Sequence, residues 1–195
     1  MLPLWVASSS PRRHDLLSQY RVPFIAIPNL LAVEPSPEYP ECGIRYAVRC
    51  TKQKVTASYS GYSGLIMGVD TVVEWQGRIL GKPADSSQAL YQLQAFMGTT
   101  HRVISTCVLW DTHRNIWLYC VDYAIVSVSL VPESILIDYI HRYPVLDKAG
   151  GYGIQDNPSF IHIAWGDRAT IMGLPLRRLL KLLYGYGIVN AWQYP

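Results

Sequence analysis

Residues 7–13, Ala-Ser-Ser-Ser-Pro-Arg-Arg, combine the start of a helix with two positively charged side chains. Ser10 suits the N-cap position, and Pro11 suits the first helical position, where its missing N–H removes no hydrogen bond. Free backbone N–H groups, the positive end of the helix dipole and the guanidinium groups of Arg12 and Arg13 would then face one point. We expect an anion site there, with phosphate as its occupant.

Asp70 is the second residue with chemical potential, because it lies between Val69 and Thr71 in the apolar segment 65–75. Burying a carboxylate without a partner is costly. Four cations lie in turns or helices that could approach it: Arg12, Arg13, Lys54 and Lys82. A buried acid among such cations forms either a structural ion-pair network or a phosphate and metal site, and the residues alone leave both open.

Two loops carry further residues suited to a ligand. Residues 81–83, Gly-Lys-Pro, hold Lys82 on a rigid turn, where it is either a point charge for phosphate oxygens or a solvated surface lysine. Residues 147–155, Asp-Lys-Ala-Gly-Gly-Tyr-Gly-Ile-Gln, place three glycines within four positions, so the backbone can approach a ligand closely. In this loop Gln155 offers an amide for a base edge, and Tyr152 offers a ring for stacking.

The composition indicates a folded chain without a nucleic-acid surface. Half of the 195 residues are hydrophobic and 16% are charged, which excludes a disordered chain, and a net charge of +3 gives no basic stripe. The four cysteines, at positions 42, 50, 107 and 120, form no metal-binding pair, so we expect reduced, buried thiols. With no apolar run of the ~20 residues needed to span a bilayer and no secretory pattern, we expect a cytoplasmic protein without membrane contact.

The hydrophobic periodicity predicts an α/β fold with a mixed sheet, because hairpins accompany the crossovers. Predicted strands cover residues 4–7, 24–27, 65–75, 78–80, 101–110, 116–130 and 160–164. Predicted helices cover 11–20 and 44–58, the segment after an Asp85 cap, the segment after 132, and 175–184. Gly98 is expected to end the third helix in a left-handed conformation. The proline-rich segment 28–41, which contains Glu34 and Glu38, is expected to be a loop.

Other catalytic patterns are absent from the sequence. There is no G-x-x-x-x-G-K-[ST] phosphate loop, no G-x-G-x-x-G after a strand and no G-x-S-x-G elbow. The five histidines show no metal-ligand spacing. The candidate chemistry therefore rests on the cations, Asp70 and the glycine-rich loop.

Five segments in the same order resemble the Maf family of nucleotide pyrophosphatases: residues 7–13, 68–73, 81–83, 147–155 and 172–176. Each motif is weak alone, but together they extend over nearly the whole chain. The resemblance implies an elongated mixed sheet flanked by helices, related to inosine-triphosphatase-like proteins. It also implies one domain over residues 1–195, with two lobes around a central cleft. Family members are often homodimers.

The resemblance further implies a reaction. Such enzymes use a divalent metal cation, Mg²⁺ or Mn²⁺, to cleave nucleoside triphosphates between the α and β phosphates, releasing a monophosphate and pyrophosphate. The Asp-Lys-Ala-Gly…Gln form of residues 147–155 looks like the branch acting on dTTP and UTP, in nucleotide-pool housecleaning that extends to modified pyrimidines. The alternative is a regulator of septum formation that binds a nucleotide without hydrolysing it. A third candidate, a nucleic-acid-binding module, would need a basic stripe that this sequence does not have.

Carried over to this sequence, the resemblance assigns roles to individual residues. Asp70 would be the catalytic carboxylate, either activating water or holding the metal, and nearby cations would favour the second role. Glu34 would be the second metal-side carboxylate, with Glu38 as its substitute. The residues implied to bind substrate are Ser8, Arg12, Arg13, Lys54, Thr71, Lys82 and Gln155, of which Thr71 and Gln155 would select the base.

Overall fold

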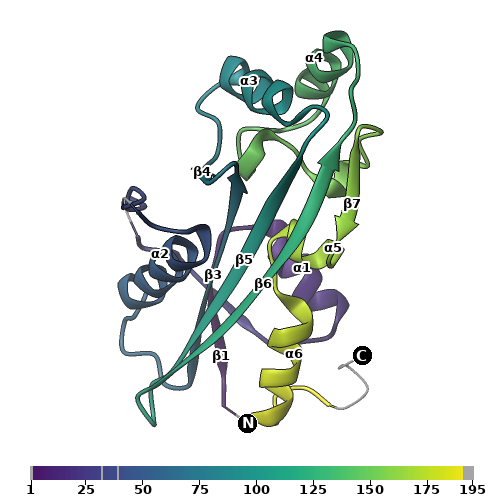
Figure 1. The fold of residues 1–195 in the computed structure, drawn as a ribbon. Helices are drawn as coiled ribbons and strands as arrows, with labels where there is room; N and C mark the ends of the chain where they lie inside the picture. The colour runs from purple at the N-terminus through teal and green to yellow at the C-terminus, as the bar shows by residue number, and fades with distance from the viewer. Residues whose placement is uncertain (1, 32, 39, 191–195) are drawn as a thin grey trace.

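A seven-stranded mixed sheet organises the chain in the computed structural model, which describes residues 2–31, 33–38 and 40–190 (Figure 1). The strands are β1 (Leu4–Ala7), β2 (Ile25–Ile27), β3 (Leu65–Trp75), β4 (Arg78–Leu80), β5 (Thr100–Asp111), β6 (Ile116–Val128) and β7 (Ile161–Trp165). Their order is β2-β1-β3-β5-β6-β7, and β4 pairs with β3. The pairings of β1 with β2 and β3 are parallel and the others antiparallel, which confirms the predicted fold class.

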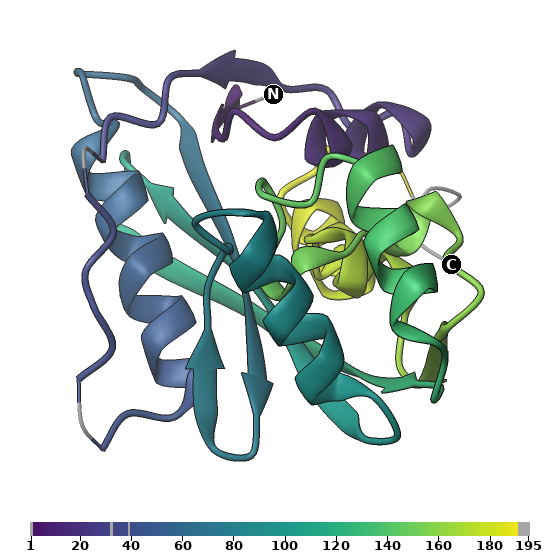
Figure 2. The same ribbon diagram turned by 90° about the horizontal axis from the view of Figure 1, so that it is seen from above.

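Helices cover both faces of this sheet. They are α1 (Pro11–Gln19), α2 (Gly43–Ala57), α3 (Ser86–Phe96), α4 (Glu133–Arg142), α5 (Arg168–Met172) and α6 (Leu176–Gly185), with 3₁₀ turns η1 (Ala149–Gly151) and η2 (Ile154–Asp156). Helix α2 lies on one side of the sheet, and α1 and α6 lie on the other (Figure 2). None of the helices in the described part of the chain is long and apolar enough to cross a membrane.

Alternate side chains of β3 join separate hydrophobic clusters. Met67 and Val69 pack with α1, α5 and α6, whereas Ile66 packs with Val55 of α2. Val73 belongs to a further cluster that includes residues of α3 and α4. Because successive side chains of a strand point to opposite faces, burial on both faces explains the continuous apolar pattern of β3.

One edge of β3 is open for four residues. Strand β1 ends where Ala7 pairs with Gly68, and β4 begins to pair only where Leu80 meets Val73. Residues 69–72 therefore pair with β5 on one side only. Since β1 and β4 leave a gap here, side chains from both faces of β3 can reach the same space at this edge.

The helix ends that the sequence predicts are confirmed in part. Asp85 caps α3 by accepting a hydrogen bond from the Gln88 N–H at 2.7 Å, and Gly98 has the expected positive φ of 69°. Ser10 occupies the N-cap of α1, but its side chain makes no capping hydrogen bond. Its N–H instead donates to Ser8 Oγ at 3.3 Å.

One expectation needs correction, and one helix was not predicted. Cys42 is exposed, whereas the other three cysteines are free and buried as predicted. The periodicity gave no signal for α5, because a helix of five residues is shorter than two turns.

Gly68 lets α2 pack closely on β3. A Cβ atom at this position would lie 2.7 Å from Val55 Cγ2 and 3.0 Å from the Thr51 carbonyl oxygen, both on α2. Since backbone atoms of a packed helix cannot yield as a flexible side chain does, any larger residue must push the helix away from the strand.

We therefore expect Gly68→Ala to lower the free energy of unfolding by about 1–3 kcal/mol, the usual cost of overpacking. Urea denaturation followed by circular dichroism measures the change. Gly185→Ala is the matched control, because nothing lies within 4 Å of its added Cβ atom. Equal stability of Gly68→Ala and the wild type would contradict this account of the helix–sheet contact.

Candidate active site

Lys54 joins two carboxylates at the open edge of β3. Its Nζ lies 2.9 Å from Asp70 Oδ1 and 2.7 Å from Glu34 Oε1. Lys54 is 4% exposed and Asp70 is 7% exposed, so this ion pair is largely removed from solvent. A buried carboxylate needs such a partner, and the close packing of α2 on β3 supplies it.

One oxygen of Asp70 remains uncommitted. Oδ1 forms the ion pair with Lys54 and accepts a hydrogen bond from the Thr71 N–H at 2.9 Å, whereas the buried Oδ2 has no hydrogen-bond partner. A buried polar atom without a partner is costly in a site with no ligand. Oδ2 is therefore free to accept a proton, a water hydrogen or a cation.

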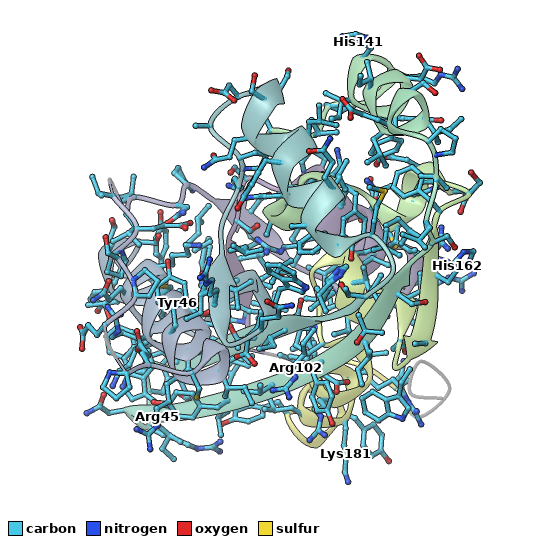
Figure 3. The ribbon with its side chains drawn as sticks, turned by 45° about the horizontal axis from the view of Figure 1, so that its top comes forward. Arg45, Tyr46, Arg102, His141, His162 and Lys181 are labelled. Carbon is cyan, nitrogen blue, oxygen red and sulfur yellow. The ribbon has the colours of Figure 1, made fainter. Side chains whose placement is uncertain are left out.

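The loop that carries Glu34 is fastened to α2. The Tyr46 hydroxyl donates to the Pro35 carbonyl oxygen at 3.0 Å, and Figure 3 shows Tyr46 on this helix. Arg49 forms an ion pair with Glu38, whose side chain is 75% exposed. Glu34, and not its alternative Glu38, thus reaches Lys54.

The surrounding cations keep Glu34 ionised. Partial burial works to raise its pKa, but the hydrogen bond from Lys54 and the charges of Lys54 and Lys82 outweigh that effect and lower the pKa below its ordinary value. Lys82 itself forms no ion pair with any residue that the structure describes, so its ammonium group is uncommitted.

Arg12 is held across the cavity by the glycine-rich loop. Its Nη1 lies 2.7 Å from Asp147 Oδ2, and the other oxygen of Asp147 lies 2.9 Å from Lys148 Nζ. Burial works to raise the pKa of Asp147, but the hydrogen bonds from Lys148 and Arg12 outweigh it and lower the pKa. A single ionised carboxylate therefore holds two cations at the mouth of the site.

Arg13 donates hydrogen bonds to three residues that line the cavity. Its Nε donates to the Gly173 carbonyl oxygen at 2.9 Å, Nη2 to Thr71 Oγ1 at 3.1 Å and Nη1 to Ser8 Oγ at 3.4 Å. Burial lowers the pKa of this guanidinium, and the negative charge of Asp70 opposes the shift. Arg12 and Arg13, adjacent in sequence, thus differ in their partners.

All of the sequence-predicted site residues line one cavity of about 230 Å³. They are Ser8, Arg12, Arg13, Glu34, Lys54, Asp70, Thr71, Lys82 and Gln155. Asp70 and Thr71 reach it from opposite faces of β3, as the open strand edge allows.

Sequence reasoning missed several lining residues: Asn29, Asp147, Lys148 and Gly173. Asp147 and Lys148 lie inside a motif that was recognised, so a search for the counter-ion of Arg12 within that motif could have found them. Asn29 lies two residues after the end of β2, and its position after a parallel strand was the available signal.

Tyr152 does not offer a free ring for stacking. It is 5% exposed, and its hydroxyl shares a hydrogen bond of 2.7 Å with Nε2 of the buried His101. Burial lowers the pKa of His101 to about 4, so this ring is neutral near pH 7. Tyr152 does line the cavity, but its ring is buried in the hydrophobic cluster that includes Phe96 and Leu93, so it leaves little surface on which a base could stack.

Protein groups alone do not form a complete metal cage. Over the described residues, no cluster of three or more His, Cys, Asp or Glu side chains could hold a metal ion. His141 and His162 lie apart on the outer surface in Figure 3. Glu34 and Asp70 still fit a hard cation such as Mg²⁺, which binds through one or two carboxylates and completes its shell with water and substrate phosphate. The orphaned Oδ2 of Asp70 supports that fit.

The cavity is suited to a polyanion. Five cations line it, Arg12, Arg13, Lys54, Lys82 and Lys148, against three carboxylates, Glu34, Asp70 and Asp147. The excess of positive charge attracts phosphate groups. A carboxylate with a free oxygen beside such groups can position water or a metal for attack on phosphorus.

Known proteins resemble this chain along most of its length. A dTTP/UTP pyrophosphatase of Alcanivorax borkumensis is 33% identical over 97% of this chain and 98% of the relative, and one of Salinibacter ruber is 36% identical over 93% and 89%. The solved structure of the Staphylococcus aureus Ham1 protein covers 94% of this chain and 97% of its own, with 11% identity and a TM-score of 0.47.

A family model described as "Maf-like protein" matches residues 3–186. That range contains all five motifs, and each of them contributes residues to the cavity. The chain therefore belongs to the Maf family.

Proposed function

We propose that this chain is a nucleoside triphosphate pyrophosphatase that hydrolyses the α–β bond of dTTP and UTP, releasing the monophosphate and pyrophosphate. The observation that carries the proposal is the free Oδ2 of Asp70 in a cavity with an excess of positive charge. The relatives named dTTP/UTP pyrophosphatase support the same reaction and substrates.

The cations of the cavity bind and stabilise the phosphates. Lys82, which has no ion pair within the described ranges, and Arg12, at the start of α1, both line the cavity and would bind the triphosphate. Lys54 adds charge beside Asp70. Because negative charge grows on the leaving pyrophosphate during cleavage, fixed cations lower the barrier most where that charge develops.

Arg13 and Ser8 shape the phosphate site from below. The guanidinium of Arg13 contributes its charge while its N–H groups hold Ser8, Thr71 and Gly173 in place. Such fixed donors need no rearrangement when substrate enters, which favours binding.

A divalent cation is the cofactor of this proposal, with Asp70 and Glu34 as its protein ligands. When bound, it would neutralise phosphate charge and make a coordinated water more acidic. Asp70 either holds the cation or accepts a proton from the attacking water, and its unpartnered Oδ2 suits both roles. Lys54 keeps the other oxygen of Asp70 in a fixed position.

The proposal assigns selection of the base to Gln155 and Thr71, which both line the cavity. Gln155 presents an amide whose donor and acceptor complement the imide edge of uracil or thymine. Thr71 Oγ1 is held by Arg13 Nη2 and bonds to Ser105 Oγ at 2.9 Å, so its position is fixed for contact with the substrate.

Replacing Asp70 by Asn should reduce pyrophosphate release by about a hundredfold or more, since the amide can neither accept a proton nor hold a cation well. The Asn carbonyl oxygen can still accept the bonds that Oδ1 receives, so the fold should remain. Pyrophosphate release from UTP and dTTP and thermal unfolding are the two measurements. Retention of most activity would refute the role of Asp70, and binding of nucleotide by the wild type without any cleavage would favour the regulator.

Removal of divalent cations should abolish pyrophosphate release, and Mg²⁺ or Mn²⁺ should restore it, because the two carboxylates need a cation to act on phosphate. Protein dialysed against EDTA is assayed with UTP before and after each metal is added, and Ca²⁺ serves as a control for charge alone. Full activity after dialysis, with metal content verified by mass spectrometry, would contradict the proposal.

Gln155→Glu should change the ranking of bases more than the rate on the best one. A carboxylate loses the amide donor and repels a base carbonyl oxygen, which reverses part of the complementarity to uracil and thymine. The comparison is of kcat/KM across UTP, dTTP, CTP and GTP, with Gln88→Glu on the exposed start of α3 as control. An unchanged ranking would remove Gln155 from base selection.

A further inference from the structure

The short segment that carries Gln155 is tied down by contacts outside the cavity. Gln155 lies within η2 and lines the cavity together with Gly153, whereas Asp156 of the same turn is not among the lining residues. Two side chains from separate helices, Tyr139 of α4 and Arg168 of α5, hold this segment. Neither side chain lines the cavity, so neither contacts a substrate there.

Tyr139 holds the segment at two points. Its hydroxyl donates to Asp156 Oδ2 at 2.7 Å and accepts from the Gly153 N–H at 2.9 Å. Burial raises the pKa of this tyrosine, so the hydroxyl keeps the proton that it donates. One hydroxyl therefore fixes the residues on both sides of the Ile154–Gln155 pair.

Arg168 holds the opposite side. Its Nη2 lies 2.8 Å from the Ile154 carbonyl oxygen and 2.8 Å from Asn157 Oδ1. Asn157 has a φ of 49°, a left-handed conformation that reverses the chain immediately after η2. The backbone of Gln155 is thus fixed from α4 and from α5.

Gly153 leaves room for the Gln155 side chain. A Cβ atom on Gly153 would overlap Gln155 Nε2 and lie 2.7 Å from Asp156 Oδ2. The φ of Gly153 is −121°, which any residue adopts, so a larger residue here would act by displacing these side-chain ends and not by straining the backbone. The amide of Gln155 is accordingly packed against the backbone that Tyr139 holds.

We propose that Tyr139 and Asp156 are positioning residues for base choice, which set the orientation of the Gln155 amide toward a pyrimidine. The inference rests on the proposed function and extends it to residues outside the cavity. Because the hydroxyl and carboxylate fix η2 without touching substrate, their loss lets Gln155 rotate. Discrimination between bases then weakens, while phosphate binding and the chemistry at Asp70 continue.

The experiment compares three variants with the wild type. Tyr139→Phe removes both hydrogen bonds, Asp156→Ala removes one, and Asp156→Asn keeps an oxygen that can accept from the hydroxyl. Tyr143→Phe is the matched control, since its ring packs on Tyr139 at 5.0 Å and its hydroxyl makes no hydrogen bond within the described residues. Each protein is assayed for kcat and KM with UTP, dTTP, CTP and GTP, and its thermal unfolding is recorded.

The ratio of kcat/KM for UTP to that for GTP should fall by about threefold to tenfold in Tyr139→Phe and Asp156→Ala, the range expected for one or two hydrogen bonds. Asp156→Asn and Tyr143→Phe should keep the wild-type ratio. An unchanged ratio, or an equal loss with every nucleotide, would overturn the proposal, because a purely structural role lowers all rates together.

Two further outcomes can be told apart from a failure of the positioning role alone. If Tyr139→Phe unfolds below the assay temperature, Asp156→Ala decides alone, since its partly exposed carboxylate can be removed with less loss of packing. If the wild type releases no pyrophosphate from any nucleotide, the proposed function fails, and the role in base choice fails with it.

Discussion

The need to neutralise Asp70 inside a buried strand governs the arrangement of this site. A carboxylate that is 7% exposed requires a cation within hydrogen-bond distance, and Lys54 provides it at 2.9 Å. Lys54 can do so only because α2 packs closely on β3 over Gly68. Lys54 in turn binds Glu34, so the position of one helix fixes both carboxylates that are proposed to face the metal.

The gap beside β3 gives a ligand access to this ion pair. Strands normally separate alternate side chains onto opposite faces, so Asp70 and Thr71 would not meet the same ligand in the middle of a complete sheet. Because β1 ends at Ala7 and β4 starts to pair at Leu80, residues 69–72 have a free edge that both side chains can reach. The loops that follow β1, β2 and β4 close around this edge.

The sequence predicted those parts of the structure that local chemistry determines. The bounds of β1 and β3 follow from apolar runs, and the Asp85 cap and Gly98 follow from backbone preferences. The pairing of Arg12 with Asp147 links positions 135 residues apart and has no local signal. Whether Glu34 or Glu38 faces the site was equally hidden, since an irregular loop has no periodicity that assigns its side chains to a face.

The carboxylates of the cavity explain how its positively charged side chains can converge before substrate binds. Converging ammonium and guanidinium groups repel one another, and Asp70, Glu34 and Asp147 offset that repulsion by lying between them. A triphosphate must therefore share Arg12 and Lys54 with carboxylates that already hold them, and only Lys82 is uncommitted among the described lining cations. Tight binding of phosphate in the ground state is limited by this sharing. The cations stabilise the transition state most, because negative charge on the phosphates increases during cleavage. An interaction that is stronger in the transition state than in the ground state is what raises the rate.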